Sequence, residues 1–173
     1  TITISLIIVA IVAPYIAPYS PLETDPINKL EPPSKKHLFG TDGLGRDILS
    51  RVLYGARITI RIAILILVLS GSVGTMIGIL AGYFGGNVDN ILMRVTDIFI
   101  AFPRLILAMA ISAALGPSLN NVVIALSIAQ WTYFARLARS KALVAAEEDY
   151  VEAAEATGAS SARILFIHVL PMA

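Results

Sequence analysis

Apolar residues are grouped in four long stretches, at 1–17, 58–84, 91–115 and 122–137, with polar segments between them. A helix needs about 20 mostly apolar residues to cross a hydrocarbon core that is roughly 30 Å thick. Lipid offers no hydrogen-bonding partners to the backbone, so each stretch is predicted to be helical. The pattern therefore predicts an all-α, polytopic transmembrane helical bundle.

Polar segments between these stretches predict one long loop and two short turns. Segment 18–57 carries several prolines and the glycine-rich run 40–47, and we expect an ordered loop or cap outside the membrane. Within it, Asp42 is predicted to hold a turn, and Asp47 to cap a helix that begins near Ile48. The glycine-rich run lacks the lysine of a phosphate-binding loop. The turns at 85–87 and 116–118 predict antiparallel neighbouring helices, with Gly116 ending one helix and Ser118 capping the next.

Three glycines of the second stretch, Gly74, Gly78 and Gly82, recur at every fourth residue. This spacing places them on one face of a helix, where a second helix can approach closely. The alternative is that glycine is simply more frequent in membrane helices than in soluble ones. Both interpretations concern packing rather than chemistry.

Composition supports a membrane protein and argues against several kinds of chemistry. Hydrophobic residues make up 57% of the 173 residues and charged residues 14%, against roughly 25% charged in soluble domains. The net charge of +1 does not suggest a nucleic-acid partner, and the lack of cysteine excludes thiolate metal sites and cysteine nucleophiles. His37 and His168 have no companions for a metal site, and no nucleophile and base are suitably spaced, so we expect no catalytic residues and no metal.

The first stretch is interpreted as a clipped transmembrane helix rather than a signal peptide. It lacks a basic leading region, and Pro14 and Pro18 stand where a cleavage site would need small residues. We expect that the chain has lost its beginning and that it also stops early.

A polar stripe runs along the third stretch, because Arg94, Asp97, Ala101 and Arg104 lie within about 80° on a helical wheel. These residues either line a cavity or include a charge pair between Arg94 and Asp97, one turn apart. The alternative is that both arginines extend to the cytoplasmic interface. Pro103 is expected to kink the helix. In the fourth stretch, the polar atoms of 130–132, including those of Gln130, either contact substrate or bond to neighbouring helices, and we favour the structural role.

The segment 141–173 is predicted to form two short helices with a bend. Residues 148–157 show a helical pattern that places Glu148, Glu152 and Glu155 on one side and small residues with Tyr150 on the other. Gly158 is predicted to end this helix, Ser160 or Ser161 to cap the next, and Pro171 to end that one after Leu170. Alanines flanked by carboxylates are suited to docking in a groove with a basic rim on a partner protein.

Basic residues after the fourth stretch indicate the orientation. By the positive-inside rule, Arg136, Arg139 and Lys141 place 141–173 in the cytoplasm. The rule is not unanimous, because counting back across the stretches puts the other basic residues on the outer side; these are Lys29, Lys35, Lys36, Arg46, Arg51, Arg57 and Arg61.

The residues of 148–171 resemble the EAA motif of ABC importer permeases. The match consists of Glu152-Ala153-Ala154, then Gly158 after three residues, then Leu170-Pro171. His168 stands where the general motif has isoleucine, as is frequent in the dipeptide/oligopeptide/nickel branch, whereas Met172 replaces that branch's usual asparagine. Further stretches similar to the C-type subunit of this branch are 37–42, Gly45-Arg46-Asp47, Ser50-Arg51, Gly82-Tyr83 and Ala101-Phe102-Pro103.

This resemblance implies a type I, MetI-like permease fold with about four of six expected spans present. It implies a multi-pass subunit of the inner, cytoplasmic membrane that imports peptides or related solutes and is surrounded by lipid. The implied partners are a homologous second permease, two cytoplasmic ABC ATPases that hold ATP and Mg²⁺, and an extracytoplasmic solute-binding protein. The expected division is a first helix at 1–17, a cap at 18–57, helices at 58–140 and a coupling loop at 141–173. The residues expected to couple to the ATPase are Glu148, Tyr150, Glu152, Ala153, Ala154, Gly158, Leu170 and Pro171.

Two other classes of function stay open from the sequence. A channel or structural membrane subunit would show flux that does not depend on ATP. A membrane-embedded enzyme would use Arg94, Asp97 and Arg104 as a buried polar site and would be active without an ATPase partner. The transported solute is not indicated by any residue pattern.

Overall fold

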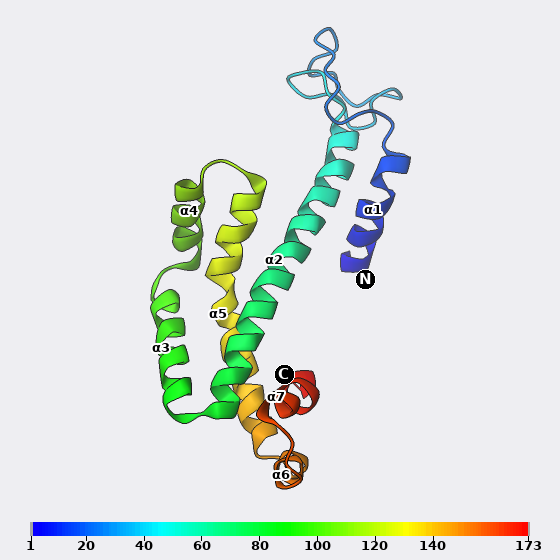
Figure 1. Cartoon of the computed structure of the whole chain (residues 1–173). Coiled ribbons are helices and arrows are strands. Elements are labelled where there is room, and N and C mark those ends of the chain that lie inside the picture. The colour runs from blue at the N-terminus through cyan, green and yellow to red at the C-terminus, as the bar shows by residue number, and fades with distance from the viewer. Residues whose placement is uncertain (1, 173) are drawn as a thin grey trace. The chain divides into compact units, whose positions relative to one another are not determined.

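The computed structural model describes residues 2–172, without the side chains of residues 2, 3 and 155. The described part of the chain is helical and contains no strand apart from an isolated bridge between Thr41 and Asp47. The chain is divided into two compact units, the first formed by residues 1–64 and the second by the residues from 65 onward. Figure 1 shows the elements, which are α1 (Ile2–Ile16), α2 (Ile48–Phe84), α3 (Gly86–Ala101), α4 (Arg104–Leu115), α5 (Leu119–Ala146), α6 (Asp149–Ala156), α7 (Ser161–Ile164), a π-helical turn (Leu165–Val169) and a 3₁₀ turn (Leu170–Met172).

In the first unit, a buried polar cluster joins the polar segment to the start of α2. The Ser50 backbone N–H donates to Asp47 Oδ2 at 2.8 Å, so Asp47 caps α2, which begins at Ile48 as predicted. The other Asp47 oxygen lies 3.0 Å from His37 Nδ1. The Tyr19 ring packs at a tilt against the His37 ring, with ring centroids 4.8 Å apart. The Tyr19 backbone N–H donates to the Ser50 hydroxyl at 3.1 Å. These bonds hold the chain that leaves α1 against the first turn of α2.

The predicted turn at Asp42 is confirmed. Its carboxylate accepts hydrogen bonds from the backbone N–H groups of Leu44 and Arg46, at 2.8 and 3.0 Å, and from the side chains of Arg46 and Arg51. Desolvation acts to raise the pKa of Asp42, but the hydrogen bonds and the Arg46 charge outweigh it and lower the pKa to about 2. Asp42 therefore neutralises part of the positive charge of this segment.

In the second unit, the glycine face of α2 packs closely against α5. A Cβ atom added at Gly74, Gly78 or Gly82 would lie 2.6–2.7 Å from the Cβ atom of a residue on α5, and these partners recur at the same four-residue spacing: Phe134, Ala138 and Ala142. No Cβ fits at such distances, so glycine is what permits this approach. The predicted packing face is confirmed, and α5 is its partner.

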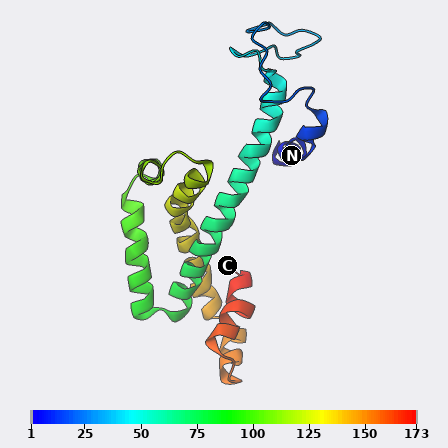
Figure 2. The ribbon, with the colours of Figure 1, turned by 45° about the horizontal axis from the view of Figure 1, so that its top comes forward.

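The prediction of one continuous helix over 91–115 is wrong. The chain breaks at Phe102-Pro103, and α3 and α4 meet at a bend of 87°. Figure 2 shows α4 nearly end-on where α3 lies along the plane of the view. Phe102 is extended, with ψ of 136°, because a residue before proline is driven out of the helical region. Pro103 thus breaks the helix, where only a kink was expected.

By length and apolar composition, one described helix, α2, is suited to cross a membrane, or two if α3 and α4 together form one broken span. The stretch predicted at 1–17 forms a helix of 15 residues in the described range, with Pro14 inside it. Helix α5 has 28 residues and extends beyond the predicted 122–137 at both ends, so residues 141–146 belong to α5 rather than to a loop. In their described residues the four predicted stretches are mainly helical, with the break at Phe102-Pro103, but not all of them form span-length apolar helices.

The predicted turn at 116–118 is present with one change in capping, whereas at 85–87 only Gly85 separates α2 from α3. Gly116 adopts φ of 88°, which favours glycine, at the C-terminus of α4. Ser118 occupies the N-cap position of α5 but makes no side-chain capping bond. Instead, the Asn121 side chain donates to the carbonyls of Leu115 and Gly116, at 2.7 and 3.0 Å. Helices α4 and α5 consequently pack side by side, as Figure 1 shows.

Candidate coupling site and interhelical cleft

A bend between two short helices forms the candidate coupling site, residues 147–172. Gly158 adopts φ of 79°, a left-handed conformation, and ends the segment begun by α6. Ser160 then accepts a hydrogen bond from the Arg163 backbone N–H at 3.4 Å and caps α7. Both features were predicted, and the structure identifies Ser160 rather than Ser161 as the cap.

The second helical piece does not end before Pro171, contrary to the prediction. The chain passes from α7 through the π-helical turn and the 3₁₀ turn, which ends at Met172. The Leu170 N–H bonds to the Leu165 carbonyl, five residues back. Pro171 lies in the last described turn, where its missing N–H removes only one hydrogen bond.

Apolar side chains anchor this segment to the ends of α2 and α5. Val151, Ile164 and Val169 are at most 1% exposed and pack with Ile79 of α2. Three alanines of α5 complete the cluster, namely Ala138, Ala142 and Ala145. We call this group the anchor core. The segment is therefore packed directly against α2 and α5.

The anchor core corrects the predicted face of α6. We expected Tyr150, Ala153, Ala154 and Thr157 to share a docking face, but Val151 is the buried residue and Ala154 is half-buried against the anchor core. Ala153 and Thr157 are exposed, together with Glu152. Val151 and Ala154 are three residues apart and therefore share one helix face, but the local sequence pattern does not show that this face is the buried one.

The remaining predicted coupling residues are divided between surface and interior. Glu148, Gly158 and Pro171 are exposed, whereas Leu170 is half-buried against the anchor core. Tyr150 is 39% exposed, and its ring centroid lies 5.9 Å from that of His168. Glu155 was predicted on the acidic side, and its side chain lies outside the described residues. The predicted coupling residues that are exposed are therefore Glu148, Tyr150, Glu152, Ala153, Gly158 and Pro171.

Two interhelical ion pairs join α3 to α5. Arg139 Nε and Nη2 donate to the two oxygens of Asp89, both at 2.5 Å. Arg136 Nη2 donates to Asp97 Oδ1 at 2.7 Å. The predicted pairing of Arg94 with Asp97 is therefore wrong, because an arginine of the neighbouring helix bonds to Asp97 instead.

A cleft of about 620 Å³ opens between α3 and α5 at these ion pairs. Arg94 and Asp97 line it, as the cavity interpretation predicted, and the other lining residues are Asp89, Asn90, Met93, Arg136 and Arg139. Arg104 is not among them, because it starts α4 beyond the bend and is exposed. The bend therefore interrupts the predicted polar stripe.

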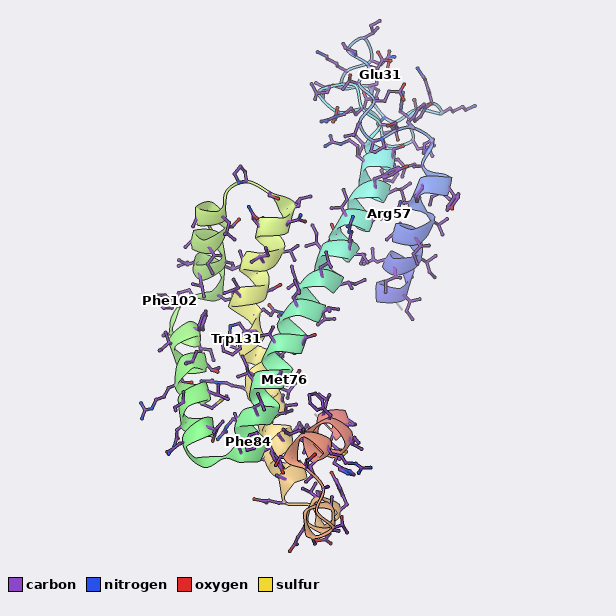
Figure 3. The ribbon with its side chains drawn as sticks, viewed as in Figure 1. Glu31, Arg57, Met76, Phe84, Phe102 and Trp131 are labelled. Atoms are coloured by element: carbon purple, nitrogen blue, oxygen red, sulfur yellow. The ribbon has the colours of Figure 1, made fainter. Side chains whose placement is uncertain are left out.

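Gln130 is half-buried on α5, beside the buried Trp131 and Thr132. The Trp131 ring packs edge-on against Phe99 of α3, with ring centroids 5.4 Å apart. Figure 3 labels Trp131 on α5 and Phe102 at the nearby break. The contact of Trp131 supports the structural interpretation of this part of the helix.

Comparison with known proteins identifies the family. The family model described as "Binding-protein-dependent transport system inner membrane component" matches residues 74–173. The chain belongs to this family of transport permeases. A second model, the N-terminal TM domain of oligopeptide transport permease C, matches residues 1–33. The family match includes all three residues of the glycine face, the cleft and the whole candidate coupling site.

Named permease relatives agree with the resemblance to the dipeptide and oligopeptide branch. The dipeptide transport system permease protein DppC of Alkalihalophilus pseudofirmus is 44% identical over 96% of this chain and 55% of its own length. A putative peptide transport system permease protein of Brucella suis is 46% identical over 96% of this chain and 56% of its own. The oligopeptide transport system permease protein OppC of Bacillus subtilis is 39% identical over 99% and 56%. The chain thus spans just over half the length of these permeases.

Proposed function

We propose that the chain is part of the permease subunit of an ATP-driven, binding-protein-dependent importer of peptides or related small solutes. The observation that carries this proposal is the anchored candidate coupling site. Glu152 and Ala153 are exposed on one side of α6, while Val151 on the other side is buried in the anchor core. The similarity to peptide permeases supports peptides as the solute class.

This arrangement would let α6 bind a partner protein and pass the partner's movement to the transmembrane helices. Exposed Ala153 leaves room for a shallow groove on a partner, and the Glu152 carboxylate can meet a basic rim. A push on α6 would move Val151, and the close-packed anchor core would pass that displacement to the ends of α2 and α5. The proposed partner at this site is a cytoplasmic ABC ATPase, one of two in the complete importer.

The remaining proposed partners follow from the importer architecture. A homologous permease would complete the pathway, and an extracytoplasmic solute-binding protein would deliver the solute. We propose a multi-pass subunit of the inner membrane, with the candidate coupling site in the cytoplasm and segment 18–47 outside. ATP hydrolysis is assigned to the partners, and this subunit is proposed to have no catalytic site. In the cleft, Asp89 and Asp97 are each paired with an arginine, which disfavours a role as a general base.

Charge reversal in the full-length permease tests the coupling proposal. The importer is reconstituted with its ATPases, and Glu152→Lys and Ala153→Arg are compared with Glu23→Lys, a matched reversal at an exposed carboxylate of the other unit. We expect both site variants to lower the affinity of the permease for its ATPases about tenfold, which corresponds to about 1.4 kcal/mol. We also expect them to abolish ATP-driven uptake. The control should behave as wild type.

Undiminished affinity for the ATPases and undiminished solute uptake in both site variants would contradict the proposal. Solute flux that persists in wild-type vesicles without ATP would instead support a channel. Both outcomes are measured in one preparation, so loss of assembly and loss of coupling are distinguished.

A further inference from the structure

The cleft between α3 and α5 carries an excess of positive charge. Three guanidinium groups, of Arg94, Arg136 and Arg139, face it together with two carboxylates. The carboxylate of Asp97 is paired with Arg136, and that of Asp89 is paired with Arg139. Among the residues that the structure describes, Arg94 forms no ion pair. One full positive charge is therefore available to an anion.

Arg136 keeps N–H donors that its ion pair does not use. Arg136 and Asp97 are joined by one hydrogen bond, and their side chains are 55% and 59% exposed, respectively. Most N–H groups of the Arg136 guanidinium therefore remain accessible. Guanidinium groups bind phosphate oxygens through parallel N–H bonds, which makes a phosphate diester a well-matched ligand.

An apolar groove adjoins this cleft and shares Arg136 with it. The groove has a volume of about 490 Å³ and is lined, besides Arg136, by Ile100 and Thr132 and by the exposed side chains of Tyr133 and Leu137. Ile100 lies one helical turn beyond Asp97, so the lining changes from charged to apolar along α3. A free anion would fill only the polar cleft, whereas a ligand with a charged head and an acyl chain would fill both.

From these features we infer that the α3–α5 cleft binds an anionic phospholipid. The phosphate lies among Arg94, Arg136 and Arg139, and an acyl chain lies in the groove at Tyr133 and Leu137. Basic pockets between membrane helices on the cytoplasmic side bind anionic headgroups in this way. The assignment to the cytoplasmic leaflet rests on the proposed orientation, whereas binding itself does not depend on ATPase coupling.

The inference is tested by native mass spectrometry of the full-length permease in its complete importer, with phosphatidylglycerol and phosphatidylcholine added in detergent. We expect phosphatidylglycerol to bind more tightly than phosphatidylcholine. Arg94→Gln breaks no ion pair and should weaken phosphatidylglycerol binding about fivefold, the effect expected for one basic residue near an anionic headgroup. Arg104→Gln removes an exposed arginine outside the cleft and is the matched control, which should bind as wild type.

A second pair of measurements separates lipid from a free anion. Leu137→Ser changes a 46% exposed side chain of the groove and should weaken binding of phosphatidylglycerol without altering the assembly of the importer. Inorganic phosphate at millimolar concentration should displace little of the lipid. Equal binding of the two lipids, or an Arg94→Gln variant that binds as wild type, would overturn the inference. Displacement by phosphate, with no effect of Leu137→Ser, would replace the lipid with a simple anion and also overturn it.

ATP-driven uptake distinguishes failure of this inference from failure of the proposed function. If Arg94→Gln loses lipid while Glu152→Lys retains it, the lipid site and the coupling site are independent. If wild type binds no lipid but imports solute, only the present inference fails.

Discussion

Gly78 of α2 lies directly against Ala138 of α5, so that a Cβ atom at residue 78 would be 2.7 Å from the Ala138 Cβ. Every real pair of Cβ atoms lies farther apart, and the carbonyl of Ala135 is also in the way. The two helices can therefore pack at this distance only with glycine at position 78. In a membrane, where lipid is as apolar as the helix surface, such packing is a main source of helix association.

Replacing Gly78 with alanine is expected to destabilise the bundle. The added methyl group meets backbone as well as side chain, so the helices must separate, at an expected loss of about 1–3 kcal/mol. Gly71→Ala in the same helix is the matched control, because nothing lies within 4 Å of a Cβ there. Unfolding in a detergent titration measures the difference. Equal stability of the two variants would show that α2 and α5 are not packed as described.

Truncating Val151 is expected to weaken coupling as well as stability. This side chain is 1% exposed in the anchor core, and Val151→Ala leaves a cavity worth about 1–3 kcal/mol. Val144→Ala removes the same atoms from a side chain that is 62% exposed and serves as the control. In the reconstituted importer we expect Val151→Ala to hydrolyse ATP with less solute imported per ATP. An unchanged ratio would argue against transmission through the anchor core.

Local signals in the sequence predicted some features well. Asp47, Gly158 and Ser160 each act within a few residues of their own position, and the capping and turn they predicted are present. The helix face at Gly74, Gly78 and Gly82 was also predicted, because periodicity alone defines it. The resemblance carried by the EAA motif led to the correct family.

Features that depend on contacts between helices were predicted less well. Asp97 was paired with Arg94, its neighbour on the same helix, whereas Arg136 on α5 reaches it across the interface. Similarly, the inner face of α6 is decided by the location of Ile79 and the alanines of α5, which the local pattern does not reveal. Pro103 indicated a distortion, but the 87° bend also depends on how α4 packs against α5.

Exchange of the charges of Asp89 and Arg139 is expected to restore what each single change removes. The pair is bidentate and only partly exposed, so Asp89→Asn should reduce stability by about 1–3 kcal/mol, as for other hydrogen bonds to charged groups. Asp97→Asn breaks a more exposed pair and should reduce it by less than about 1 kcal/mol. The unfolding of Asp89→Arg/Arg139→Asp is compared with each single variant. If the double variant is no more stable than the singles, the two residues do not form a stabilising pair.

Acid is expected to loosen the polar segment before it unfolds the helices. Asp42 has a pKa of about 2 in the folded chain, below its ordinary value of 3.8, so its stabilising effect is complete above about pH 4 and declines as pH falls toward 2. Desolvation would raise the pKa of Asp47, but hydrogen bonds from Ser50 and His37 lower it. The stabilising effect of the Asp47 carboxylate is therefore also lost as the pH falls. Hydrogen exchange at the Leu44 and Arg46 amides, corrected for intrinsic rates, should accelerate over this range. Asp42→Asn should show fast exchange already at pH 6, whereas Glu23→Gln, at an exposed carboxylate, should leave the profile unchanged. Protection in Asp42→Asn equal to that of wild type would mean that another group holds this turn.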